Sequence, residues 1–374
     1  MKNNLIYADN AATTQLDIEA YEAMTPFLLE QYANPSQPYS FSRSSKKALK
    51  EARKTIAECI GAEYEDEIIF TSGGTESDNW AIKSCYGETG NVITSVIEHH
   101  AILNSCKKLE NEDRNVKYVP VDNKGVIDLG YLGQIVDEST SLVSVMLANN
   151  EIGTIQPINS ISKITHEIGC LLHTDAVQAV GHIPVNVMEL GVDLLSASAH
   201  KFNGPRGIGF LYIKRGTAID SFIDGGQQEY GLRAGTENVA SIVAMSVALK
   251  KNCIQLKENK EKLELMESQL IAGLKSRNID FIKNGAINKV PGNISISFRE
   301  RDGEALLHRL DLMGICVSTG SACDSVNTQI SHVIKAINVP EEYAAGTIRI
   351  SLGKDNTSEE VMAIVEALDR IINA

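Results

Sequence analysis

The stretch SASAHKFNGPRGIGFLY, residues 196–212, joins two short apolar runs through a turn rich in glycine. The runs, VDLLSAS at 192–198 and GIGFLYIKR at 207–215, have the length and composition of buried strands. His200 and Lys201 follow directly after the first run. A lysine at the end of a buried strand is costly unless it is paired or neutral, so Lys201 is a candidate amine nucleophile. The alternative is a strand-end lysine that reaches solvent.

Short β-rich runs alternate with helical patterns upstream of this stretch. The pattern predicts helices at 76–87, 99–110 and 158–169. Strands that alternate with helices imply crossover connections and a mostly parallel sheet covered on both faces. We therefore expect an α/β fold. The further strands are predicted at 67–74, 91–97, 116–122, 141–147 and 170–176.

The pattern changes after Glu237. Residues 237–277 predict one long helix or two in sequence, followed by a smaller α+β arrangement. We predict a large domain at 16–255, and a small C-terminal domain made of 1–15 and 256–374. The small-domain strands are expected at 292–298, 315–321 and 347–353, and its helices at 303–314 and 358–374.

The composition is that of an ordinary folded protein. The chain has 374 residues, of which 43% are hydrophobic and 22% charged, and its formal net charge is −13. An acidic chain is a poor candidate for direct nucleic-acid binding through a basic face. The N-terminal sequence lacks signal-peptide and transit-peptide patterns, and no uncharged apolar run approaches the ~20 residues of a membrane helix. We expect a cytoplasmic protein without a membrane segment.

Two further groups of polar residues follow predicted strands. Asp175 and Gln178 come after the run at 170–176. The end of a parallel strand faces the ligand crevice, where a carboxylate can pair with a protonated pyridine nitrogen. The alternative for Asp175 is a helix N-cap. Gly74 and Thr75 open a helix and offer backbone N–H groups to a phosphate, although a glycine turn before a helix is also commonplace.

His99 and His100 stand at another strand end. One of them could stack on an aromatic cofactor or move protons. No Cys-x-x-Cys pair and no H-E-x-x-H motif supports a metal site, and none is expected. Arg349, within a predicted strand, could hold a substrate carboxylate, the alternative being a surface ion pair.

Cys323 differs from the other cysteines because it lies in STGSACDSVN, a small, polar segment at 318–327. Such a segment can expose and move a thiol, which makes Cys323 the candidate nucleophile. The remaining six are interpreted as packing residues because they lie in apolar or amphipathic runs: Cys59, Cys85, Cys106, Cys170, Cys253 and Cys316.

In their joint order these motifs resemble the NifS/IscS-type cysteine desulfurases, within the class V group of enzymes that depend on pyridoxal 5'-phosphate (PLP). The resemblance covers essentially the whole chain, from YADNAATT at 7–14 to TIRISLG at 347–353. Between these it is carried by NPS (34–36), FTSGGTESDN (70–79), EHHAI (98–102), NNEIGTIQP (149–157), HTDAVQAVG (173–181), SASAHKFNGPRGIG (196–209), GLRAGTEN (231–238) and GSAC (320–323).

This resemblance implies the PLP-dependent transferase fold, like that of aspartate aminotransferase, and a set of roles. Lys201 should form the Schiff base with PLP, and Cys323 should receive sulfur from L-cysteine as a persulfide, leaving L-alanine. His99 should stack on the cofactor and Asp175 should pair with its ring nitrogen. The other implied cofactor-binding residues are Gly74, Thr75, Asn150, Gln178, Ser198, His200 and, from the second subunit of a homodimer, Thr236. Asn34 and Arg349 should bind the substrate carboxylate.

Other readings stay open on the sequence alone. One is a selenocysteine lyase or β-elimination lyase on the same fold. Another is a non-catalytic sulfur-relay partner, and a metal enzyme is a distant further reading. The sulfur acceptor implied by the resemblance is an Fe–S scaffold, a tRNA-thiolation enzyme or a partner in cofactor sulfuration.

The chain also departs from many relatives. Gln227 stands where many have a third glycine, Tyr230 where many have arginine, and Ser42-Arg43 replaces a common Gly-Arg. We expect these changes to affect the dimer interface and the mouth of the site. The chain ends soon after its last predicted helix, whereas longer relatives use a C-terminal extension to help dock a scaffold protein.

Overall fold

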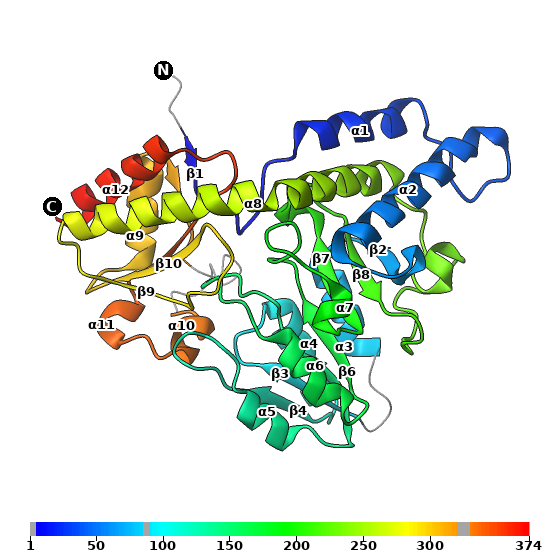
Figure 1. The fold of residues 1–374 in the computed structure, drawn as a ribbon, viewed down its shortest axis with the longest axis horizontal. Coiled ribbons are helices and arrows are strands. Elements are labelled where there is room, and N and C mark those ends of the chain that lie inside the picture. Colours follow the sequence, from blue (N-terminus) through cyan, green and yellow to red (C-terminus); the bar gives the residue numbers. More distant parts are fainter. Residues whose placement is uncertain (1–4, 85–89, 320–329, 374) are drawn as a thin grey trace.

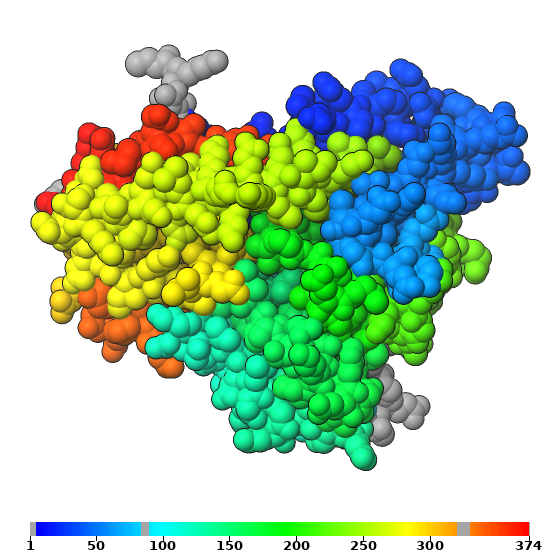
Figure 2. All heavy atoms as spheres, viewed as in Figure 1, coloured from blue at the N-terminus to red at the C-terminus, as the bar shows by residue number. Residues whose placement is uncertain are grey.

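The computed structural model describes residues 5–84, 90–319 and 330–373. Two bodies of secondary structure lie side by side and share one long helix, α8 (Val239–Ser276), which runs along both (Figure 1). The larger body contains the predicted alternation of strands and helices. On the face shown in Figure 2, the two bodies meet along a continuous boundary.

The larger body is built on a seven-stranded sheet. Strand β8 pairs antiparallel with both of its neighbours, β2 and β7, and the remaining pairs are parallel. The mostly parallel α/β fold predicted from the sequence is therefore confirmed. In spatial order the strands are β2 (Ile68–Thr71), β8 (Gly209–Ile213), β7 (Leu194–Ser198), β6 (Leu171–Asp175), β5 (Thr140–Ser144), β3 (Asn91–Ser95) and β4 (Val116–Val119).

Helices cover both faces of this sheet. Alternate residues of one strand enter different cores: Ile68 and Phe70 pack into one cluster, and Ile69 packs into the other. The first cluster also takes residues from α2 (Arg43–Ile60) and α8. This separation follows from the two-residue period of a strand. The other helices of this body are α1 (Ile18–Leu29), α3 (Gly74–Ser84), α4 (His100–Asn111), α5 (Leu129–Ile135), α6 (Ile158–His166) and α7 (Val187–Leu190).

The smaller body has an antiparallel sheet in the order β12-β10-β9. A two-residue parallel pair, β1 (Ile6–Tyr7) with β11 (Ile315–Cys316), joins the chain's beginning to this body. Of the strand predicted at 315–321, only 315–316 form a strand within the described residues 315–319, and residues 320–321 lie outside the described part of the chain. The remaining elements are β9 (Phe281–Lys283), β10 (Asn293–Phe298), β12 (Thr347–Ser351), α9 (Gly303–Leu312), α10 (His332–Ala336), α11 (Glu341–Ala344) and α12 (Ser358–Ile372).

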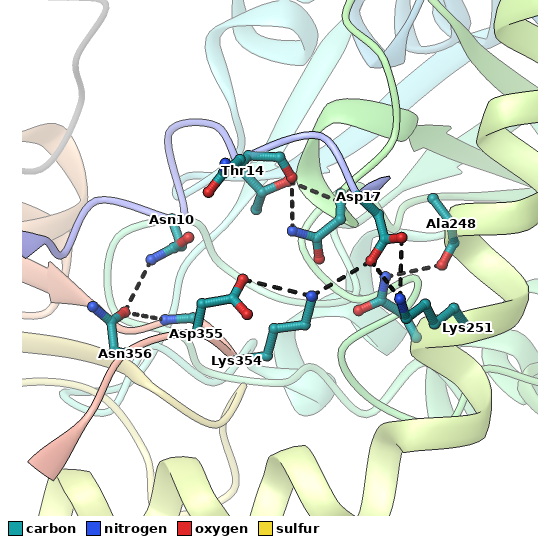
Figure 3. A network of polar contacts seen from close by, with 12 residues as sticks. Asn10, Thr14, Asp17, Ala248, Lys251, Lys354, Asp355 and Asn356 are labelled. Carbon is teal, nitrogen blue, oxygen red and sulfur yellow. Dashed lines mark hydrogen bonds and ion pairs between the residues drawn. The ribbon is translucent and has the colours of Figure 1, made fainter. Parts of the chain in front are cut away.

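Helix α8 is a single helix across the predicted domain boundary. By length and composition it could cross a membrane, but 56% of its most apolar window is buried inside the protein. Asp17, at the start of α1, forms ion pairs with Lys251 of α8 at 3.0 Å and with Lys354, which precedes α12, at 3.5 Å (Figure 3). This carboxylate therefore links elements of both bodies.

Candidate active site

A cavity of about 510 Å³ opens where the carboxyl ends of β6 and β7 meet the beginnings of α3 and α4. This is where ligands bind in α/β sheets, and the volume suits a small cofactor with a substrate. The structure brings most of the predicted site residues together here. Those that line the cavity are Gly74, Thr75, His99, Asn150, Asp175, Gln178, Ser198, His200, Lys201 and Arg349.

Lys201 enters the cavity from a short turn directly after β7. Its Nζ donates hydrogen bonds to the carbonyl oxygens of Ala11 at 2.6 Å and Ala12 at 2.8 Å. Gln178 Nε2 donates to the same Ala11 oxygen at 2.9 Å. The N-terminal segment thus forms one wall of the site and fixes the position of the amine.

Asp175 is the last residue of β6 and is only 5% exposed. Burial raises the pKa of its carboxyl group to about 6, while the Val177 N–H and the charge of Lys201 act in the opposite direction. Burial likewise raises the pKa of Asp78, a neighbouring carboxylic acid in α3. The floor of the cavity can therefore hold a carboxylate that favours a cationic partner.

His99 is the N-cap residue of α4. Its Nδ1 accepts a hydrogen bond from the N–H of Ala101 at 3.1 Å, so the ring carries its proton on Nε2 when neutral. Burial lowers the pKa of His99 to about 4, and the nearby charge of Lys201 adds to this effect. The ring is thus neutral at pH 7 and presents an uncharged aromatic surface. His100 also lines the cavity and contacts the ring of His332, with centroids 5.1 Å apart.

Residues 72–75, in the turn from β2 into α3, form a cup in the cavity wall that contains two adjacent glycines, Gly73 and Gly74. Gly73 has a φ of +148°, which favours glycine, and a Cβ at Gly74 would lie 2.5 Å from Cγ2 of Val177. Thr75, in the first turn of α3, and Ser198, whose side chain lies beside Gly73 and Gly74, also line the cavity. Backbone N–H groups at a helix start bind anions, so this cup suits a phosphate group.

Arg349 reaches the opposite wall from β12 of the smaller body. Its Nη2 pairs with Oδ1 of Asp9 at 2.7 Å, and its Nη1 donates to the Asn150 carbonyl oxygen at 2.9 Å. On the lining near the N-terminal segment, His200 Nδ1 lies 3.2 Å from Oγ1 of Thr13. A guanidinium group in this position can receive a carboxylate that enters the cavity.

Three predicted residues are not in this lining. Asn34 lies elsewhere, where its Oδ1 accepts the Ser36 N–H at 2.9 Å. Thr236 is exposed and does not contribute to the cavity of its own chain. Cys323 lies outside the described residues.

The described chain on both sides of residues 320–329 is attached to the cavity. On one side, Ser318 N donates to the Arg349 carbonyl oxygen at 3.0 Å. On the other, Ser331 Oγ donates to Glu151 Oε2 at 2.6 Å, and His332 Nε2 lies 3.1 Å from the Glu98 carbonyl oxygen. Arg349, Glu151 and Glu98 all line the cavity.

Sequence reasoning missed the buried acids of the site: Asp78, Glu98 and Glu151. Burial raises the pKa of Glu98 to about 8, although Ser95 Oγ donates to its carboxyl group at 2.5 Å. A carboxylic acid beside a predicted strand end or helix start is the signal that could have identified them. Within the described ranges, no three His, Cys, Asp or Glu side chains converge as a metal site.

A lysine, a buried aspartate and a neutral histidine around one cavity suit an enzyme that uses PLP, and comparison with known proteins supports this class. Residues 6–364 match the family described as Aminotransferase class-V, and the chain belongs to this family.

Several relatives within the family are named as cysteine desulfurases, and solved structures of similar proteins match the fold. The chain is 50% identical to cysteine desulfurase IscS of Dictyoglomus turgidum, covering 98% of this chain and 94% of the relative. A solved NifS-like protein has a TM-score of 0.93 at 38% identity, with 99% of both chains covered. A structure described as SspA in complex with cysteine has a TM-score of 0.82 at 32% identity, covering 93% of this chain and 98% of that one. The predicted resemblance to NifS/IscS-type enzymes is thus confirmed.

Proposed function

We propose that this protein removes sulfur from L-cysteine, gives L-alanine and carries the sulfur as a persulfide on Cys323. The observation that carries the proposal is the arrangement of Lys201, Asp175 and His99 around one cavity beside a glycine cup. The cysteine desulfurase relatives support this substrate and reaction.

Family membership implies PLP as the cofactor, and the donor set of the cavity fits it. Lys201 would hold the aldehyde carbon, Asp175 the ring nitrogen, and the cup at Gly74 and Thr75 the phosphate. The buried Asp175 supports this assignment, and so does Gly74, where a Cβ would lie only 2.5 Å from Cγ2 of Val177 and would shift the turn. The remaining cofactor-binding residues would be His99, Asn150, Gln178, Ser198 and His200. When bound, PLP supplies an electron sink for the α-carbon of an amino acid.

The chain's own residues would then position the substrate and move its proton. Arg349 would bind the carboxylate of cysteine, because its fork is held by Asp9 and the Asn150 carbonyl at the cavity wall. Lys201 Nζ, fixed by two backbone carbonyls, would accept the α-proton. The neutral His99 ring would cover the cofactor face without adding a positive charge beside it.

Cys323 would take the sulfur as a thiolate. Its sulfur forms an S–S bond with the substrate sulfur, the substrate C–S bond breaks, and protonation of the remaining three-carbon unit gives alanine. The attachments of Ser318, Ser331 and His332 to residues of the cavity support this role, because they bring both ends of the intervening segment to the site.

The first test is alanine release from L-cysteine with a reductant present, for the wild type beside Cys323→Ala. Alanine from the wild type and almost none from the variant is the expected result. Equal release by both would overturn the persulfide and favour a lyase on the same fold. A wild type that binds PLP and releases no alanine from cysteine would reject cysteine as the substrate. A chain that takes up no PLP would favour a non-catalytic relay partner.

The homodimer, the sulfur acceptor and the cytoplasmic location are parts of the proposal. The exposed Thr236 is supported as a group offered to a second subunit, since it lies outside the cavity of its own chain. Light scattering and mixing of Lys201→Ala with Thr236→Val subunits would test this, because mixed dimers regain one intact site. The proposed acceptor is an Fe–S scaffold or a tRNA-thiolation protein, to be tested by transfer of labelled sulfur.

A further inference from the structure

Two cysteines that the sequence assigns to packing meet in a groove away from the active site. Cys59 on α2 and Cys253 on α8 are both only half-buried, whereas Cys106 and Cys170 are buried. The Cys253 thiol lies 4.0 Å from the carbonyl oxygen of Cys59. Both cysteines line one open groove. A pair of accessible thiols is chemically different from a buried packing residue.

The fold places these thiols together, because α2 packs along α8. Cys59 lies in the last turn of α2, and Cys253 lies near the middle of α8. Both helices contribute to the core on one face of the large sheet, so neither thiol depends on a loop for its position. A disulfide requires such closely placed cysteines on backbones that need not move far.

The surroundings make the two thiols unequal. They share a hydrogen bond, which raises the pKa of Cys59 and lowers the pKa of Cys253. Lys250 lines the same groove, and its charge acts to lower the pKa of Cys59 against the stronger effects that raise it. The lowered pKa of Cys253 favours it over Cys59 as the nucleophile of the pair.

We propose that Cys59 and Cys253 form a redox-sensitive pair that a peroxide converts into a disulfide between α2 and α8. The Cys253 thiolate attacks one peroxide oxygen, the O–O bond breaks, and a sulfenic acid and water result. The Cys59 thiol then attacks the sulfenic sulfur, the S–S bond forms, and a second water leaves. Two thiols are oxidised and one hydrogen peroxide is reduced to two waters.

The disulfide would join α8 to the large body close to where the helix leaves it. Leu263, Met266 and Leu270, further along α8, pack in the core of the smaller body. The two cysteines are 194 residues apart in sequence, so the bond would close a long loop in the unfolded chain. We expect oxidation to raise the midpoint of thermal unfolding by about 3 °C or more, reversibly with dithiothreitol.

The test treats the full-length reduced protein with hydrogen peroxide, blocks remaining thiols by alkylation and maps tryptic peptides without reduction. The expected product links peptide 55–83 to peptide 252–257 as the dominant disulfide, with the loss of two hydrogen atoms. Carrying out the reaction in a Cys323→Ser background prevents oxidation at the proposed sulfur acceptor from competing. The outcome is independent of the proposed desulfurase activity.

Cys253→Ser and Cys59→Ser should each abolish the link and the thermal shift, while Cys106→Ala, a buried control, should keep both. The same oxidation in guanidinium should lose the preference for this pair, because the fold brings the thiols together. Peroxide that oxidises Cys253 in the folded wild type without joining it to Cys59 would overturn the proposal. The wild-type map decides this even where a variant folds poorly.

Discussion

Asp9 and Arg349 form a 2.7 Å ion pair at the edge of the cavity, although 340 residues separate them in sequence. Arg349 is 3% exposed, and its Nε has no hydrogen-bond partner within the part of the chain that the structure describes. The guanidinium group is therefore held through its two Nη atoms. A charged fork held in this way can meet an incoming carboxylate with little loss of side-chain entropy.

Arg349→Lys tests this arrangement. A lysine ammonium group lacks the planar fork of donors that arginine has. It therefore cannot bind Asp9, the Asn150 carbonyl oxygen and a substrate carboxylate in the same geometry. We expect KM for L-cysteine to rise by roughly tenfold or more, corresponding to the loss of one charged hydrogen bond, with a smaller change in kcat. Steady-state alanine release measures both. An unchanged KM would show that Arg349 does not bind the substrate, and Arg299→Lys, on an exposed ion pair, is the control.

Gly74→Ala tests the cup. The added Cβ would lie 2.5 Å from Cγ2 of Val177, so the turn must shift where the phosphate is proposed to bind. We expect PLP affinity to fall by about tenfold or more, measured by equilibrium dialysis, which corresponds to about 1.4 kcal/mol. Gly133→Ala is the matched control, because a Cβ there meets nothing within 4 Å. If both variants bind PLP equally well, the phosphate lies elsewhere.

His99→Asn tests the neutral imidazole through the pH dependence of stability. The folded pKa of His99, about 4, lies below its ordinary value. The contribution of the neutral His99 ring to the free energy of unfolding is therefore fully present above pH ~6.5, and it is lost as the pH falls through about 4. In the apoprotein we expect this group to account for about 3 kcal/mol of the wild-type loss between pH 7 and pH 4. The variant should show a shallower loss in urea unfolding, since asparagine still caps α4. If the unfolding free energy of the wild type and of the variant fell equally with decreasing pH, a buried neutral His99 would be contradicted.

Glu229→Gln tests the anchor of the segment that leads to Thr236. The Glu229 carboxylate accepts hydrogen bonds from both Nη atoms of Arg53, at 2.7 and 2.8 Å, and from the N–H of Phe70. The variant leaves a buried guanidinium without its counter-charge, so we expect unfolding free energy to fall by about 3 kcal/mol.

Glu51→Gln is the control on α2, the helix that also carries Arg53, because the pair of Glu51 with Lys47 is exposed and should contribute less than about 0.5 kcal/mol. Denaturant unfolding compares the two variants, and similar losses would show that the buried pair is not a specific anchor. Tyr230, which stands where many relatives have arginine, packs against this anchor. The Arg53 guanidinium lies 5.3 Å from the centre of the Tyr230 ring and 4.4 Å from the centre of the Phe70 ring.

Much of the fold could be predicted because its signals are local. The strand-to-helix alternation and the glycine turn before α3 depend on neighbouring residues. The ends of parallel strands meet at one edge of a sheet, so Asp175 and Lys201 could be grouped before any contact was known. Strand β11 was predicted in the right place but too long, because its partner β1 offers only two residues for pairing.

The sequence by itself therefore determined the kinds of element, their order and the residue types at the strand ends, since periodicity and turn chemistry act over a few residues. Only the tertiary structure decided which distant groups meet. It paired Asp9 with Arg349, Arg53 with Glu229 and Cys59 with Cys253, across 340, 176 and 194 residues. It also buried Asp78, Glu98 and Glu151 around the cavity. Burial and partner choice arise from the packing of whole helices and sheets, which no local pattern specifies.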